Sequence, residues 1–285
     1  MKSWKIVLAL LLLFHLLLLI VSQFTAWPEM LFWPYLILKG WLPYRDIGIA
    51  HSPLLILTLT FFYKVFGLGI FQQQIFGRGL VLLTDILIFL VLKRLFDKKT
   101  ALLALFFYIP FQVYYAGNGV WFDHALTIFP ITIFFFLQKK NYFLVGLLWA
   151  LAFFTKQTAV WFLLPILLAK PGLSFIKGAL FIVGLFSLIL LLSGLQNDYL
   201  DWTIRFGVGI LPGLAGKLTS LRLLFASLFP FTIFIPLLFR KEKHAPALFI
   251  WSVAAAMGTL PRFELFHFQP ALPFLAVSFA LSLKK

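Results

Sequence analysis

The feature that most constrains this chain is the recurrence of long apolar runs that carry almost no ionisable side chains. Residues 6–21 and 81–92 contain one such side chain each. A helix that crosses a bilayer needs about 20 mainly apolar residues and satisfies its own backbone hydrogen bonds. Since 62% of the 285 residues are hydrophobic and only 12% are charged, these runs predict an all-α integral membrane protein. The absence of cysteine excludes disulfides and cysteine-bound metals.

Ten stretches fit membrane-spanning helices, and an even number places both termini on one side. The first stretch follows basic residues as a signal peptide would, but no small-residue cleavage site comes after it, so we expect an uncleaved span. We expect a single polytopic membrane domain over residues 1–285, without a soluble domain. The predicted spans are residues 6–22, 76–92, 100–115, 122–137, 142–155, 158–169, 178–194, 220–239, 246–260 and 269–283.

The basic residues are distributed unevenly between the two faces that these spans define. Of the 24 Lys and Arg residues, 15 fall on the face of the termini, which the positive-inside rule makes cytoplasmic in a plasma-membrane protein. The net charge of +15 does not indicate nucleic-acid binding, because no basic, aromatic-laced soluble module is present. The basic residues of this face are Lys2, Lys5, Lys93, Arg94, Lys98, Lys99, Lys139, Lys140, Lys170, Lys177, Arg240, Lys241, Lys243, Lys284 and Lys285.

Residues 52–67 are apolar enough to be taken for a further span. Counting them as a span would turn every later basic loop outward, so we interpret them as a helix lying in the outer interface. Residues 23–75 then form one long first external loop. A loop of this length is far beyond the usual range, and such loops are usually functional.

Most acidic residues fall on the external face. Asp97 and Glu242 lie among cytoplasmic lysines, whereas six others are external and Asp85 lies within a span, where we expect a structural partner. Basic and histidine residues gather on the same external side, as a reaction site at the outer membrane surface requires. The external acidic residues are Glu29, Asp46, Asp123, Asp198, Asp201 and Glu264.

Asp46 lies in the stretch GWLPYRDIGIAHSPLL, at residues 40–55. It follows Arg45 directly and lies between glycine-containing turns close to the membrane interface. A carboxylate there can accept the proton of an attacking hydroxyl group, which is the role of a general base. The alternatives are a solvated carboxylate or an ion pair with a basic neighbour.

Asp123, in GVWFDHAL, is expected at the external start of the fourth span. It is either an acid favoured by the helix dipole or a second catalytic carboxylate that binds substrate hydroxyls. Asp46, His51, His124 and His267 offer possible ligands for a divalent cation. Since none of the usual ligand spacings is present, we predict no definite metal site.

Lys156, in LLWALAFFTKQTAVWF, lies between two apolar runs and too far from the cytoplasmic loops to reach them, so it must meet an anion or external water. Arg78, Arg262 and Arg45 are further candidates for a phosphate contact, because a guanidinium group matches phosphate through forked donors. Tyr44, His51, Glu264 and His267 complete the candidates as substrate-binding residues.

The stretch at residues 40–55, followed by FGLGIFQQQIFGRGL, resembles the first external loop of the GT-C superfamily of membrane glycosyltransferases. The protein O-mannosyltransferases and the aminoarabinose-transferase-like bacterial enzymes are the relatives in question. GVWFDHAL, LVGLLWALAFFTKQTA and PRFELFHFQPALPFLAV add to the resemblance, which extends from the first helix to about Ala276.

The resemblance implies a polyprenyl-phosphate sugar as the donor, used at the outer face of the membrane with inversion at the anomeric carbon. The acidic loop residue of the family corresponds to Asp46, and its second acidic position corresponds to Asp123. Many relatives have Asp-Glu where this chain has Asp46 and Ile47, which weakens transfer of a metal-binding role. Without the C-terminal soluble domain of some relatives, a lipid or glycan acceptor is expected rather than a peptide.

Other functions are compatible with the same residues. A transporter or flippase for a lipid-linked or anionic solute would place charges near the midplane and often shows inverted repeats, whereas only Asp85 is deep and no repeat is visible. A ligase-type transferase that uses only Arg and His would tolerate loss of Asp46. A structural scaffold would not need the external cluster of charges.

Overall fold

The computed structural model describes residues 3–211, 213, 220–239, 242–260 and 262–284. Over these residues the chain is helical and has no β-strand beyond two isolated bridges, Thr25 with Gly119 and Pro43 with Ile47. The elements are α1 (Ser3–Val21), α2 (Glu29–Leu38), α3 (Leu54–Phe66), α4 (Ile70–Leu95), α5 (Lys98–Tyr114), α6 (Phe122–Leu126), α7 (Ile128–Gln138), α8 (Tyr142–Thr155), η1 (Gln157–Phe162), α9 (Leu163–Leu168), α10 (Gly172–Leu192), α11 (Gln196–Leu200), η2 (Asp201–Ile210), α13 (Leu221–Leu228), η3 (Phe229–Ile233), α14 (Phe234–Phe239), α15 (Ala245–Ala256), η4 (Met257–Thr259), η5 (Leu265–Ala271) and α16 (Leu272–Ser282).

The helices follow the apolar runs of the sequence, and the predicted all-α membrane fold is confirmed. Five helical stretches in the described part of the chain are long and apolar enough to cross a bilayer, namely 3–21, 70–95, 172–192, 221–239 and 265–282. The other predicted spans coincide with α5 and with shorter apolar helical stretches, two of which include a 3₁₀ segment, η1 before α9 and η4 after α15. That all ten ranges cross the membrane stays a prediction.

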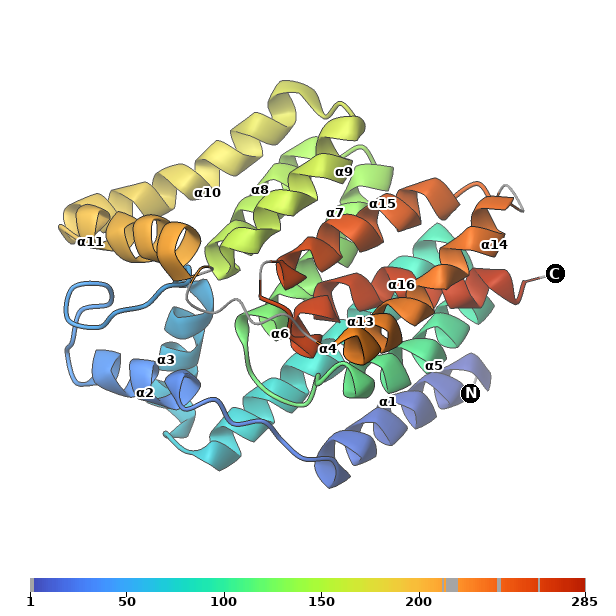
Figure 1. Ribbon diagram of the computed structural model, residues 1–285, viewed down its shortest axis with the longest axis horizontal. Helices are drawn as coiled ribbons and strands as arrows, with labels where there is room; N and C mark the ends of the chain where they lie inside the picture. The colour runs from blue at the N-terminus through green and yellow to red at the C-terminus, as the bar shows by residue number, and fades with distance from the viewer. Residues whose placement is uncertain (1–2, 212, 214–219, 240–241, 261, 285) are drawn as a thin grey trace.

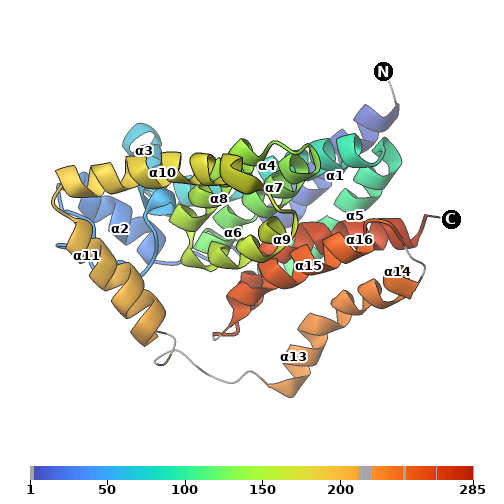
Figure 2. The same cartoon turned by 90° about the horizontal axis from the view of Figure 1, so that it is seen from above.

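Both termini lie at one end of the helix bundle, and the first external loop lies at the other (Figures 1 and 2). Contacts between distant residues join the elements at the terminal end. Lys284 Nζ lies 2.6 Å from Asp97 Oδ2, which ties α16 to the turn before α5. Lys93 Nζ lies 4.6 Å from the centre of the Trp4 ring, which ties α4 to α1. Of the basic residues predicted to share this end, Lys2, Arg240, Lys241 and Lys285 lie outside the described residues.

The predicted interfacial helix is α3, which crosses the end of the bundle at a steep angle to the long helices (Figure 1). Its buried residues Leu55, Ile56 and Leu59 belong to a small core together with Ile47 and Ile49 of the preceding loop. Because this small core also includes Phe122 and Phe154 of the bundle, it packs the external loop against the bundle. The crosswise direction supports the interpretation that α3 rests in the interface.

The packing of α8 against α10 positions a central residue of the site. Gly146 and Gly178 face the partner helix so closely that an added Cβ would run into the carbonyl oxygen of Phe175 or Phe143. Small residues allow this approach of helix backbones in membranes. Because α8 ends at Thr155, this packing sets where Lys156 leaves the helix.

Asp85, predicted to need a structural partner, has one in His15. His15 Nδ1 lies 2.7 Å from Asp85 Oδ2, and His15 Nε2 lies 3.0 Å from Gln112 Oε1. All three side chains are buried and come from α4, α1 and α5. Polar groups inside a membrane pair in this way because lipid offers them no hydrogen bonds. The contact fixes α1 to the bundle.

Candidate active site

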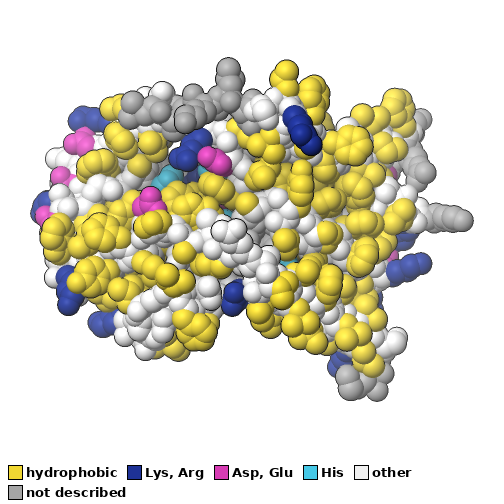
Figure 3. Space-filling model, turned by 60° about the horizontal axis from the view of Figure 1, so that its bottom comes forward, with side chains coloured by type: hydrophobic (Ala, Val, Ile, Leu, Met, Phe, Trp, Pro, Cys, Tyr) yellow, Lys and Arg dark blue, Asp and Glu magenta, His cyan; other side chains and the backbone are white. Residues whose placement is uncertain are grey.

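A cavity of about 210 Å³ lies where the external loop meets the ends of several helices. On the face that Figure 3 shows, acidic, basic and histidine side chains gather at one place in a surface that is mainly hydrophobic. The charged side chains lining the cavity are Glu29, Lys156 and Arg262. The remaining lining residues are Trp27, His51, Trp121, Thr158, Gly207, Leu211, Gly258, Leu260, Phe266 and His267.

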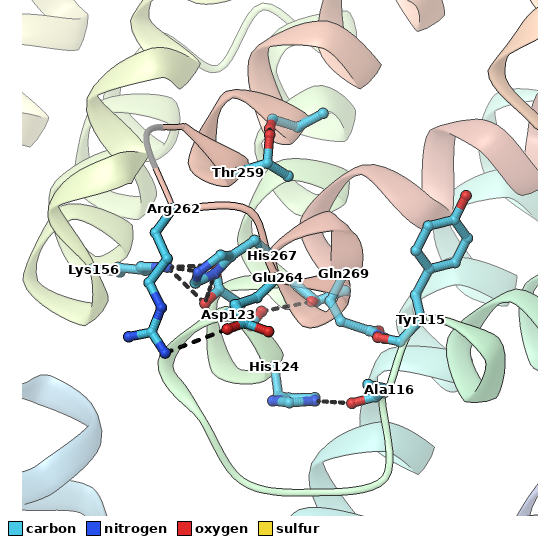
Figure 4. Close-up of polar contacts among 12 residues, drawn as sticks. Tyr115, Ala116, Asp123, His124, Lys156, Thr259, Arg262, Glu264, His267 and Gln269 are labelled. Atoms are coloured by element: carbon cyan, nitrogen blue, oxygen red, sulfur yellow. Dashed lines mark hydrogen bonds and ion pairs between the residues drawn. The ribbon is translucent and has the colours of Figure 1, made fainter. Parts of the chain in front are cut away.

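Asp123, Lys156 and His267 form a buried cluster at the inner wall of the cavity (Figure 4). Lys156 Nζ lies 2.7 Å and 2.6 Å from the two carboxylate oxygens of Asp123. His267 Nδ1 lies 2.8 Å from Asp123 Oδ2 and 3.1 Å from Lys156 Nζ. With its hydrogen on Nδ1, the imidazole donates to Asp123 and keeps Nε2 as an acceptor.

Interruptions and ends of helices position these three side chains in the cluster. Lys156 has an extended backbone (φ −153°, ψ 135°) between α8 and η1, so its side chain turns away from the helix axis. Asp123 lies in the first turn of α6, where the helix dipole favours a negative charge. His267 lies in η5, just before α16. All three residues are candidates from the sequence, and their meeting in one cluster is a feature of the fold.

The cluster is nearly removed from solvent, and this changes how Lys156 can act. The side chains of Lys156 and Asp123 are 5% and 1% exposed. A buried charge needs a partner with good geometry, and here each ion has the other. Lys156 therefore already holds a carboxylate, so its predicted role as a phosphate ligand requires that it share its ammonium group with the substrate.

Arg262 is the more accessible cation. Its side chain is 52% exposed, and its Nη2 lies 3.4 Å from Glu264 Oε1, a loose contact compared with the cluster. A partly exposed pair of this kind contributes little stability. Arg262 can therefore turn from Glu264 to an incoming anion.

Glu29, one of the external acidic residues of the sequence, was not among the predicted site residues. It begins α2 and lines the cavity, and its Oε2 is buried without a hydrogen-bond partner. A carboxylate oxygen in that state is a strong acceptor for a substrate hydroxyl group. The signal that could have identified it is the Trp-Pro-Glu sequence at residues 27–29, directly after the first span.

Aromatic rings form part of the cavity wall. The ring centres of Trp27 and Trp121 are 5.3 Å apart, and that of Phe266 lies 5.2 Å from Trp27. His51 lies beside them, with its ring centre 5.8 Å from Trp121. Burial, followed by the nearby positive charge of Lys156, lowers the pKa of His51 to about 3. His51 is therefore a neutral imidazole at physiological pH.

A family model described as dolichyl-phosphate-mannose-protein mannosyltransferase matches residues 50–193, about half of the chain. The chain belongs to this family. The matched range of this mannosyltransferase-family protein includes His51, Asp123 and Lys156, whereas Glu29 and Arg262 lie outside it. No curated protein matches the sequence.

Two crystal structures of ArnT from Cupriavidus metallidurans resemble this mannosyltransferase-family chain. One is in the apo state and the other is bound to undecaprenyl phosphate, with TM-scores of 0.70 and 0.71. The sequence identity is 14% for each, and the match covers all of this chain but only 60% and 61% of the ArnT chains. The likeness confirms the predicted GT-C fold, and the family and the apolar helices together make this an integral membrane protein.

The mannosyltransferase-family chain keeps Asp46 and its neighbours apart from this cavity. Asp46 is exposed, lines a separate hollow with Lys39, Gly40 and Trp41, and accepts a hydrogen bond from Leu42 N at 2.8 Å. Its predicted role as general base stays a prediction.

The remaining predicted residues are not among the described residues that line the cavity. Arg45 pairs with Asp198 at 3.0 Å, and so joins the loop to α11. Tyr44 is buried and donates from its hydroxyl to the carbonyl oxygen of His51 at 3.1 Å, so it holds His51 in place. Arg78 lies half-buried on α4 and is not among the described residues that line the cavity.

The possible cation site of the sequence analysis has no matching geometry. Among the described residues, no three or more His, Asp or Glu side chains are arranged to hold a metal ion. His124 faces away from His267 and lies 3.0 Å, through Nε2, from the Ala116 carbonyl oxygen (Figure 4).

Proposed function

We propose that the protein transfers a sugar from a polyprenyl-phosphate donor to a hydroxyl group of a lipid or glycan acceptor at the outer face of the membrane. The observation that carries this proposal is one cavity in which two cations, Lys156 and Arg262, lie with an unpartnered carboxylate, Glu29. Support also comes from the family match and from the ArnT structure solved with undecaprenyl phosphate, since its fold is the same.

In this proposal Arg262 binds the donor phosphate, with Lys156 behind it. The bond between the anomeric carbon and the phosphate oxygen breaks, and polyprenyl phosphate leaves with the electron pair. Lys156, which is fixed and almost shielded from water, is well placed to stabilise this developing charge, and Arg262 adds a more exposed contact. Asp123 and His267 hold the Lys156 ammonium group in position, so they act on the substrate through Lys156.

The acceptor oxygen attacks the anomeric carbon from the opposite face, which inverts its configuration, and its proton passes to a carboxylate of the external loop. Two carboxylates compete for this role. Asp46 is the prediction from the sequence, but it lies at a separate hollow and is tied to its own turn. Glu29 lies at the cavity with a free oxygen, so we favour Glu29.

The aromatic wall offers a surface for the sugar ring. The faces of Trp27 and Trp121 can pack against the apolar face of a pyranose or furanose, while Glu29 and His51 supply polar contacts at its edge. Rings with a large contact area and few rotatable bonds bind at a low entropic cost. This arrangement suits one sugar ring, and it does not select a hexose over a pentose.

Replacement of Glu29 by Gln tests the base. We expect Glu29→Gln to lower the transfer rate by about 10²- to 10⁴-fold, since this is the usual contribution of a general base. Asp46→Asn should retain most activity. Asp201→Asn is the matched control, because Asp201 is an external acid paired on the surface with Arg205. The measurement is release of undecaprenyl phosphate from synthetic undecaprenyl-phosphate hexoses and pentoses, with protein in nanodiscs and a membrane lipid extract as acceptor.

The reverse result, with Asp46→Asn inactive and Glu29→Gln active, would return the base to Asp46 and leave the transferase proposal standing. The transferase proposal itself fails if the wild-type protein consumes no donor of the panel but moves it across a vesicle bilayer. That outcome would establish the transporter alternative.

A further inference from the structure

At the end of the bundle opposite the cavity, three ammonium groups surround one indole ring. The Nζ atoms of Lys5, Lys93 and Lys98 lie 5.9, 4.6 and 5.8 Å from the centre of the Trp4 ring. They come from α1, α4 and α5, and Trp4 itself stacks on Phe89 with ring centres 5.7 Å apart. Like charges held this close repel one another, and a ring face offsets only part of that repulsion.

The carboxylate nearest in sequence does not neutralise this group. Asp97 accepts hydrogen bonds from the backbone N–H and hydroxyl of Thr100, and its ion pair is with Lys284. None of the ion pairs among the described residues includes Lys5, Lys93 or Lys98. The group is therefore left with a positive charge that an anion can compensate.

An apolar groove begins beside these lysines. It has a volume of about 270 Å³ and runs between α1 and α5, where its walls are Val7, Leu11, Leu102, Leu103 and Phe106 with Lys99 at its edge. Val7 lies one helical turn from Trp4 on α1, and Lys99 follows Lys98 directly, so the groove shares α1 and α5 with Lys5 and Lys98, while Lys93 reaches Trp4 from α4. An apolar groove lined by one lysine and continuous along α1 and α5 with Lys5 and Lys98 matches an acyl chain with an anionic head.

We propose that this place binds an anionic glycerophospholipid of the surrounding bilayer. Its phosphate contacts Lys5, Lys93 and Lys98, and one of its acyl chains lies along the groove between α1 and α5. A bound lipid would add contacts between α1, which exposes most of its side chains, and the rest of the bundle. The proposal concerns stability and lipid binding alone, so it does not depend on the proposed transferase reaction.

The test compares two charge-matched variants of the full chain in neutral detergent. Lys93→Gln/Lys98→Gln removes two charges from the group, and Lys139→Gln/Lys140→Gln removes two from the turn between α7 and α8 at the same end of the bundle. Phosphatidylglycerol or phosphatidylcholine is titrated in, with bound lipid counted by native mass spectrometry and the thermal midpoint followed. We expect phosphatidylglycerol to bind and stabilise the wild type and the control, and its affinity to fall about tenfold or more in the first variant.

Equal affinities in the two variants, or equal binding of phosphatidylcholine by the wild type, would overturn the proposal. If Lys93→Gln/Lys98→Gln cannot be purified, Leu11→Trp provides the second measurement, since it fills the groove without changing any charge. Unchanged affinity of Leu11→Trp for phosphatidylglycerol would equally overturn the placing of the acyl chain.

Discussion

At the scale of single residues, the chemistry of the site depends on which charges are already paired. Lys156 and Asp123 satisfy each other at 2.6 Å in a place almost without solvent, whereas Glu29 has a free oxygen and Arg262 has only a loose partner. Breaking a buried pair leaves an uncompensated charge, which is far more destabilising than the pair is stabilising. The buried pair thus orders the site, and the less paired residues are those free to act on a substrate.

Single and double replacements of Lys156 and Asp123 test whether this pair orders the site. Lys156→Met and Asp123→Asn should each destabilise the fold, by roughly 3 to 5 kcal/mol at most for a fully stranded charge. The double variant should recover much of that loss, because neither charge remains, yet it should stay inactive. Thermal midpoints in detergent and transfer rates measure the two effects.

The exposed ion pair of Arg205 and Asp201 is the control for this set of single and double variants. Its side chains are 79% and 53% exposed, so Arg205→Met/Asp201→Asn should leave the thermal midpoint nearly unchanged. Additive losses in the Lys156 and Asp123 double variant would show that the two side chains do not interact in solution.

At the scale of elements, the close packing of α8 against α10 determines where Lys156 lies in the site. Gly178 of α10 faces the backbone of α8 so closely that no side chain fits, whereas Gly184 of the same helix has nothing within 4 Å of an added Cβ. Lys156 follows directly from the end of α8. A change in the contact of these two helices therefore moves the cation of the site as well as the bundle.

Two substitutions on α10 separate packing from helix propensity. Gly178→Leu should lower stability by about 1 to 3 kcal/mol, the usual effect of overpacking, and lower activity with it. Gly184→Leu makes the same chemical change at an open position and should be neutral or slightly stabilising. Thermal unfolding in detergent compares the two variants, and an equal loss in both would mean that the α8 contact is not the cause.

At the scale of the whole molecule, the orientation in the membrane follows from charges at the two ends. The termini share one end of the bundle, and the external loop lies at the other (Figure 2). Lysine-rich turns lie at the end of the termini, and residues of the external loop line the cavity. The positive-inside rule then predicts that the cavity faces outward. The same assignment requires α3 to rest at the interface rather than to cross it.

Because the sequence contains no cysteine, a single introduced cysteine is the one labelling site and tests this orientation directly. Single cysteines at Gly40, in the external loop, and at Lys140, between α7 and α8, should be labelled differently in intact cells by a membrane-impermeant maleimide. We expect Gly40→Cys to react from outside and Lys140→Cys to react only after the cells are permeabilised. Reaction of both from outside would mean that α3 crosses the membrane.

How much of this protein was predictable differs between the fold and the site. Apolar runs determine a membrane helix by their length alone, because lipid forces each run to satisfy its backbone within itself. The ten predicted ranges therefore coincide with helices, and short motifs were enough to indicate the GT-C resemblance that the family and fold confirm. Residues 40–55 belong to the same external loop as Trp27 and Glu29, and His51 of this stretch lines the cavity with them.

The composition of the site was decided only by the tertiary structure. The contacts of Asp123 with Lys156 and with His267 span 33 and 144 positions of the sequence, and no local pattern specifies such a meeting. The same is true of Glu29 and Arg262, which line one cavity from opposite ends of the chain, while Asp46 lies at another hollow. Charge pairing depends on the distances between packed helices. The local sequence determines where each helix forms, but only the tertiary packing determines those distances.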